Sequence, residues 1–96
     1  MPEFRGDLGY EKHPRVAIRH EEFGGLAYHY GTRRLLFLKS RALVDVVEAL
    51  ADHPTADDTL SACVSAGRVS AEQAPACAAA LPRLLDADVI RVRASG

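Results

Sequence analysis

The chain has 96 residues, of which 48% are hydrophobic and 26% are charged. This length and composition are typical of one small globular domain and exclude a two-domain enzyme. Lys and Arg number 12 against 13 Asp and Glu, a net charge of -1, which removes the general attraction that non-specific binding to nucleic acid or an anionic membrane requires. With two Cys and neither a signal-peptide pattern nor a long apolar run, we expect a soluble cytoplasmic protein with reduced thiols.

Residues 1–12 show no hydrophobic period, and we interpret them as a flexible N-terminal arm. A single domain is expected over 13–93, followed by a tail over 94–96. Alternating apolar residues after Pro14 predict a first strand, and the following Glu and Gly pairs, up to Gly25, predict a turn.

Two more strands are predicted around Gly31-Thr32, where Gly stands at the first central position of a type II′ hairpin. That loop places Tyr28 opposite Leu35 and Leu26 opposite Phe37. We interpret the face these four residues share as the core face. The other face then exposes His29, Arg34, Leu36 and Leu38.

The pattern changes to a helical period after Lys39, and three helices are predicted. Ser40 is the expected N-cap of the first helix, Thr55 that of the second and Ser70 that of the third. Gly67 is expected to end the second helix. The segment 89–92 is short and β-branched, so it is predicted to be a C-terminal strand.

These elements predict an α+β domain of the order β-β-β-α-α-α, with an antiparallel three-stranded sheet and a winged helix-turn-helix-like arrangement. The last two helices form the helix-turn-helix pair, which raises the hypothesis of a DNA-binding regulator. The polar residues of the third helix are Glu72, Gln73, Arg83 and Asp86. This balance would repel phosphates, and we therefore expect no nucleic-acid partner.

No residue pattern predicts an active site, a metal site or a cofactor. The four His lie in separate segments, and Cys63 and Cys77 lack metal-ligand spacing, so both Cys are interpreted as buried fillers. No nucleophile or phosphate-loop signature is present. The sequence therefore favours a non-catalytic binding protein.

The third strand suggests what such a protein could bind. As the last strand of the sheet it has one neighbour, so its free edge can accept an extended peptide. The cations beside it, Arg33, Arg34, Lys39 and Arg41, favour an acidic peptide. Two alternatives stay open, since residues 89–92 or a second copy in a homodimer could cover the same edge.

The segment LAYHYGTRRLLFLKS over 26–40, preceded by HPRVAIR over 13–19, resembles the peptide chaperones of the mycofactocin biosynthetic system, which belong to the PqqD-like peptide-recognition domains, also called RiPP recognition elements. The resemblance runs from about His13 to Ile90. Many PqqD-like domains carry Asn after the third strand, where this chain has Lys39-Ser40, which favours the mycofactocin branch.

The resemblance implies a chaperone that binds the leader of a ribosomally made precursor peptide and presents it to a radical SAM maturase. In relatives the leader adds as a strand beside the third strand and lies against the third helix. Carried over to this chain, that places along the peptide Arg34, Leu35, Leu36, Phe37 and Leu38, and in the groove Ala78, Leu81, Leu84 and Leu85. The hairpin phasing adds the expectation that Leu36 and Leu38 face the ligand.

Overall fold

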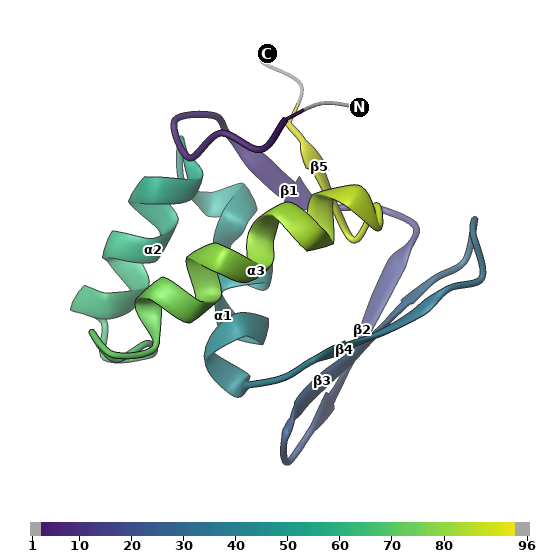
Figure 1. The fold of residues 1–96 in the computed structure, drawn as a ribbon, viewed down its shortest axis with the longest axis horizontal. Coiled ribbons are helices and arrows are strands. Elements are labelled where there is room, and N and C mark those ends of the chain that lie inside the picture. Colours follow the sequence, from purple (N-terminus) through teal and green to yellow (C-terminus); the bar gives the residue numbers. More distant parts are fainter. Residues whose placement is uncertain (1–2, 94–96) are drawn as a thin grey trace.

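The computed structural model describes residues 3–93, so residues 1–2 and the expected tail over 94–96 lie outside the described part. The helices lie beside a three-stranded sheet, and a second, two-stranded ribbon lies near the chain ends (Figure 1). In chain order the elements are β1 (Tyr10–Lys12), β2 (Val16–Glu21), β3 (Gly24–His29), β4 (Leu35–Leu38), α1 (Arg41–Ala49), the 3-10 turn η1 (Leu50–Asp52), α2 (Ala56–Ser65), α3 (Ala74–Asp86) and β5 (Ile90–Val92). The predicted α+β class is confirmed, as are its antiparallel sheet, its three helices and the C-terminal strand.

The sheet has the order β2-β3-β4, with antiparallel neighbours. Tyr28 lies opposite Leu35 and Leu26 lies opposite Phe37, so the predicted register is confirmed. The predicted two-residue turn is wrong. His29 donates its N–H to the Arg34 carbonyl (3.0 Å) and Arg33 donates to the His29 carbonyl (2.7 Å), which makes a longer loop over 30–33. The positive φ of this loop falls on Arg33, at 62°.

The turn between β2 and β3 also differs from the prediction. It is formed by Glu22 and Phe23, whereas Gly24 and Gly25 belong to β3. Gly24 has a φ of 152°, and a Cβ there would lie 2.2 Å from the Leu38 carbonyl oxygen. Gly24 is therefore required by its backbone conformation and by the close approach of β4.

The predicted core face of the sheet is wrong. Leu38 is fully buried and Leu36 is half-buried, whereas Leu35 is 55% exposed and Phe37 is 61% exposed. The buried face also carries Ala27 and His29. The pairing of strands was predicted correctly, but the helices cover the opposite side of the sheet.

Small residues on β3 explain which face is covered. Helix α1 packs against β3, and a Cβ on Gly25 would lie 2.9 Å from Cγ2 of Val44. Gly25 and Ala27 therefore leave room for the helix, which the larger Leu26 and Tyr28 on the other face would not. The face with the larger side chains is the one left in solvent.

The predicted N-caps at Ser40 and Thr55 are confirmed. Leu43 donates its N–H to Ser40 Oγ and Asp58 donates to Thr55 Oγ1, each at 3.0 Å. Ser70 and Gln73 bond reciprocally at 3.0 Å, as in a capping box, but α3 begins at Ala74 with Gln73 as its N-cap, so the predicted N-cap at Ser70 is wrong. Gly67, with a φ of 77°, follows the end of α2.

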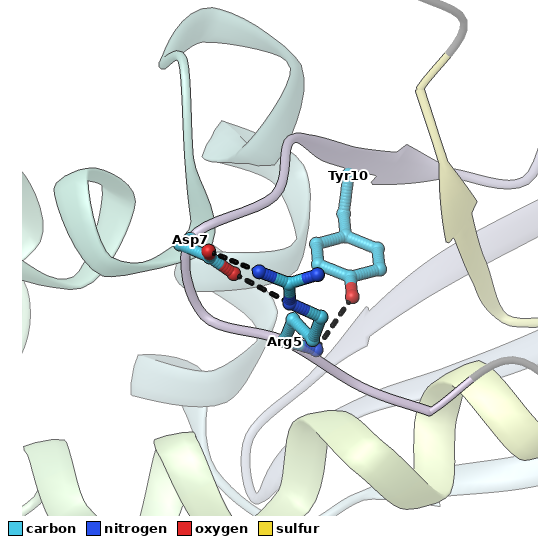
Figure 2. Close-up of polar contacts among 3 residues, drawn as sticks. All are labelled: Arg5, Asp7 and Tyr10. Atoms are coloured by element: carbon cyan, nitrogen blue, oxygen red, sulfur yellow. Dashed lines mark hydrogen bonds and ion pairs between the residues drawn. The ribbon is translucent and has the colours of Figure 1, made fainter.

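The expectation of a flexible arm is wrong for residues near Tyr10, which is fully buried and begins β1. Strand β1 pairs with β5. The Tyr10 ring stacks on Phe4 at 4.9 Å. Its hydroxyl accepts a hydrogen bond from the Arg5 N–H at 2.8 Å (Figure 2). Arg5 also makes two hydrogen bonds to Asp7, which hold the pKa of that carboxyl below its usual value.

The segment before β1 is also bonded to the helical half. Ala56 donates its N–H to the Leu8 carbonyl (2.9 Å) and Asp57 donates to the Gly6 carbonyl (3.0 Å). These are N–H groups of the first turn of α2, which lack partners inside the helix. Residues 6–8 therefore cap the N-terminus of α2, although their sequence shows no hydrophobic period.

We predict that Tyr10→Ala lowers the free energy of unfolding by about 3–5 kcal/mol, as truncation of a large buried aromatic side chain does. The matched control is Glu11→Ala, which removes only a partly exposed ion pair with Arg91 and should cost less than about 1 kcal/mol. Urea unfolding followed by circular dichroism measures both. Equal stability of the two variants would mean that β1 contributes no core packing.

Candidate functional site: the groove between β4 and α3

A groove of about 480 Å³ lies between β4 and α3. Its walls are largely apolar side chains of the two elements and of the start of α1. The lining residues are Leu36, Phe37, Lys39, Ser40, Leu43, Gln73, Ala76, Cys77, Ala80, Arg83 and Leu84. A mainly apolar hollow with a few polar groups suits a peptide side chain better than a charged small molecule.

The groove runs beside the free edge of the sheet. Within residues 3–93, β4 has β3 as its one strand neighbour. Strand β5, which could have covered the edge, pairs with β1 instead. The edge of β4 is therefore open along the groove, and its outward backbone groups need partners from solvent or from a ligand.

The hydrogen-bond phase identifies these outward groups. His29 and Arg34 form a hydrogen-bonded pair, and such pairs alternate along an antiparallel ladder. Ala27–Leu36 and Gly25–Leu38 are therefore also hydrogen-bonded pairs. The N–H and C=O groups of Leu35 and Phe37 consequently point away from β3, toward the open edge.

The residues expected along the peptide lie in different environments. Leu36, Phe37 and Lys39 line the groove. Leu38 is fully buried in the core, which makes its expected exposure to a ligand wrong. Leu35 lies on the outer face of the sheet, and Arg33 and Arg34 are exposed in the hairpin loop and just before β4.

Of the four α3 residues expected in the groove, only one lines it. Leu84 lines the groove, whereas Leu81 and Leu85 are buried in the core and Ala78 is half-buried outside the lining. Ala76 and Ala80 also line the hollow, although no sequence pattern singled them out. Their signal was the run of small residues in α3, since small side chains facing a strand leave space between the elements.

The basic residues do not form one cluster at the groove. Lys39 lines it together with Arg83, a cation that the sequence analysis assigned to no peptide site. Arg41 instead lines a separate polar hollow with Glu21, Glu22 and Asp45. The groove therefore has one cation on the strand side and one on the helix side.

The hairpin loop is organised by His29. Its Nδ1 accepts hydrogen bonds from the N–H groups of Gly31 and Thr32, each at 3.0 Å, so Nδ1 carries no proton. The His29 ring is buried and lies 4.6 Å from that of His13. Burial, and secondly the neighbouring His29, lower the pKa of His13.

The two Cys are free and buried in α2 and α3. Burial raises the pKa of Cys63 and, together with the nearby Cys63, that of Cys77. A raised pKa keeps a thiol protonated and weakly nucleophilic. Cys77 therefore contributes an apolar wall to the groove.

Over residues 3–93, no group of three or more His, Cys, Asp or Glu side chains has the arrangement of a metal site. In the same part of the chain, no helix has the length and apolarity needed to cross a membrane. The groove and the open edge of β4 are the features that point to a ligand.

The sequence profile described as the peptide chaperone MftB family matches residues 9–91. The chain belongs to this family. The matched residues run from β1 into β5 and so include the strand-rich half and the helical half of this chain.

Individual members of the MftB family are similar over most of this chain. Peptide chaperone MftB of Mycobacterium ulcerans (strain Agy99) is 51% identical over 72 residues, which cover 75% of this chain and 63% of that protein. Peptide chaperone MftB of Mycobacterium tuberculosis (strain ATCC 25618 / H37Rv) is 51% identical over 73 residues, which cover 76% of this chain and 64% of that protein. That of Mycolicibacterium smegmatis (strain ATCC 700084 / mc(2)155) is 50% identical over 72 residues, covering 75% and 68%.

The chain thus spans less than two thirds of the length of the first two relatives. No solved structure matches the chain. The family and the resemblance drawn from the sequence agree.

The pair of His rings predicts a pH dependence of stability. Because the pKa of His13 is lowered in the folded state, protons bind the unfolded state more readily. Stability is therefore full above the unfolded value of 6.5 and decreases as the pH falls through the lowered folded pKa.

We expect His13→Asn to reduce the loss of stability between about pH 7 and pH 5, since Asn does not titrate in this range and can still accept the hydrogen bond from the Arg15 N–H. His53→Asn is the control, because His53 lies outside this ring pair. Thermal unfolding at several pH values gives the slopes. Identical slopes for the wild type and His13→Asn would refute the role of His13.

Proposed function

We propose that the chain is a peptide chaperone that binds the leader of a ribosomally synthesised precursor peptide in mycofactocin biosynthesis. The leader adds as a strand to the open edge of β4 and places alternate side chains in the groove against α3. The observation that carries this proposal is the open edge, whose outward groups belong to Leu35 and Phe37 and which runs beside the groove.

Strand addition matches the geometry of this edge. Each hydrogen bond from the peptide to Leu35 or Phe37 contributes roughly 1 kcal/mol net. Alternate side chains of an extended peptide point to the same side, where Leu36, Ala80 and Leu84 offer an apolar wall. The backbone therefore supplies general affinity, and the groove selects the side chains.

The two cations of the groove favour a leader with acidic residues. Lys39 and Arg83 line opposite walls, and neither takes part in the ion pairs found within residues 3–93. A leader carboxylate between them gains attraction without displacing an existing partner. Arg33 and Arg34, before the start of β4, extend the positive charge along the peptide.

The chain contributes binding and positioning rather than chemistry of its own. Its role is to hold the leader while a radical SAM maturase, the second proposed partner, modifies the other end of the precursor. Holding the peptide by its leader raises the local concentration of the reacting end at the maturase. The curated relatives are named peptide chaperones, which supports this division of labour.

We predict that Phe37→Pro weakens leader binding at least about tenfold, the equivalent of roughly 1.4 kcal/mol. Proline removes the outward N–H at the centre of the edge. The ladder to β3 keeps its bonds, because the backbone groups of Phe37 point away from β3. Calorimetric titration with the synthetic leader measures the change.

The matched control is His20→Pro, since His20 occupies an outward-pointing position on β2, at the opposite edge of the same sheet. It should leave leader affinity unchanged. Circular dichroism checks that both variants are folded. Leader binding by folded Phe37→Pro at wild-type strength would place the peptide elsewhere.

We predict that Ala76→Trp, which fills the groove from α3, weakens leader binding at least about tenfold by steric exclusion. Ala76 is exposed and lines the hollow, so the substitution should change stability by no more than about 0.5 kcal/mol. Ala79→Trp is the control, because Ala79 is also exposed on α3 but lies outside the lining. If both variants bind the leader equally well, the side chains of the peptide do not enter this groove.

A further inference from the structure

We propose that the outer face of the sheet is the docking surface for a second protein, one whose own surface carries an apolar patch bordered by carboxylates. The outer face is the side of β2, β3 and β4 turned away from the helices, together with the hairpin loop. The inference rests on the proposed function, in which this second protein is the radical SAM maturase.

The outer face is apolar and aromatic along β3, β4 and the flanking turns, whereas β2 contributes the Arg19–Glu21 ion pair to it. At its centre, Leu26 lies opposite Phe37 and Tyr28 lies opposite Leu35. One pair of aromatic rings lies near the β2–β3 turn and another near the hairpin loop. Its large side chains are Phe23, Leu26, Tyr28, Tyr30, Leu35 and Phe37. Four of them are 48% to 62% exposed, namely Phe23, Tyr30, Leu35 and Phe37.

The rings on this face are packed against one another. Phe23 and Phe37 lie edge to face at 5.9 Å, and Tyr28 and Tyr30 do so at 5.0 Å. Tyr28 and Phe37 lie on β3 and β4, whose other face packs against α1, and each holds a ring of an adjoining turn. A contiguous exposed apolar surface on a small domain is characteristic of an interaction site, and rigid aromatic side chains are the residues that anchor interfaces.

Positive charge borders one end of the outer face. Arg15 and Arg33 lie at the hairpin loop, where Tyr30 donates its N–H to the Arg15 carbonyl at 2.8 Å. Within the described chain, neither takes part in an ion pair. Unpaired guanidinium groups beside aromatic rings suit a partner surface with carboxylates, which they can bind in pairs of hydrogen bonds.

The loop that carries these charges is held in one conformation. His29 Nδ1 accepts from Gly31 and Thr32, and the Arg34 N–H donates to Thr32 Oγ1 at 3.3 Å. Arg33 adopts a positive φ of 62°, which is unfavourable for a residue with a side chain. The loop therefore presents Arg33 in a fixed position, which lowers the entropic cost of binding.

The charges favour a different protein over a second copy of this chain. Two copies with their hairpin loops together would oppose like charges. With the loops at opposite ends, the arginines would meet the β2–β3 turn, where Glu21 already pairs with Arg19 at 2.8 Å and Glu22 is in none of the ion pairs found within residues 3–93. A second copy thus offers Glu22 alone as a free carboxylate of that turn to the two arginines of the cationic end.

The position of the face suits presentation of a bound peptide. A leader added at β4 extends the same sheet, so a protein on the outer face would contact the chaperone and the peptide together. Helix α1 packs on the opposite side of the sheet. We therefore expect the leader and the second protein to bind at the same time, each raising the affinity for the other.

The test measures binding of the purified maturase of the same organism by biolayer interferometry. The double variant Tyr28→Ser/Tyr30→Ser should weaken maturase binding at least about tenfold, and Arg15→Glu should do so with a loss of salt dependence. Neither variant should change the calorimetric affinity for the leader. Val64→Ser and Arg68→Glu are the matched controls, since both residues are exposed in the helical half.

Wild-type maturase affinity in both outer-face variants would overturn the docking surface. Sedimentation velocity tests the alternative occupant. If the wild type is a dimer that Tyr28→Ser/Tyr30→Ser converts to a monomer, a second copy covers this face and the proposal is wrong. Loss of maturase binding with intact leader binding in the outer-face variants supports the docking surface. Failure of the wild type to bind the leader would refute the proposed function. The docking surface would then be tested by the maturase affinities of the wild type and the variants.

Discussion

The close packing of α1 on β3 determines how every other surface of the domain is used. Gly25 and Ala27 let the helix approach the strand until a single added carbon would contact Val44. This approach assigns one face of the sheet to the core and leaves the larger aromatic side chains outside. It also brings Leu36 toward α3, where the small residues of that helix leave the groove open.

The sheet consequently has three distinct surfaces. One face is covered by helices, one edge borders the apolar groove, and the other face exposes aromatic rings. In the function proposed above, the leader peptide takes the edge and the second protein takes the outer face. The four-residue strand β4 would then serve both proposed partners, with its edge toward one and its outer side toward the other.

Local sequence signals predicted the local structure well. The caps at Ser40, Thr55 and Gly67, and the register between β3 and β4, depend on neighbouring residues and were readable from their spacing. The core face of the sheet was not readable from spacing, because large apolar residues on a strand predict the buried face and here they lie on the exposed one. The deciding residues were Gly25 and Ala27, whose small size matters only once the position of α1 is known.

Dependence on distant segments also explains why the sequence did not predict two groove residues and the first strand. Ala76 and Ala80 acquire meaning from what lies opposite them, and a three-residue strand at Tyr10 has no period that a sequence can display. Its partner β5 lies near the other end of the chain. Contacts between distant segments are the information that a single sequence carries least directly.

The pairing of β1 with β5 has a consequence for how the protein is made. Glu11 and Arg91, which bond across this pair, are 80 residues apart. During synthesis β1 leaves the ribosome before β5 and lacks its strand partner until every element between them has been translated. Tyr10 is therefore without the β1–β5 pairing until Ile90–Val92 emerge. The nascent chain consequently passes through a stage in which the hairpin of β3 and β4 can form while the domain is still open.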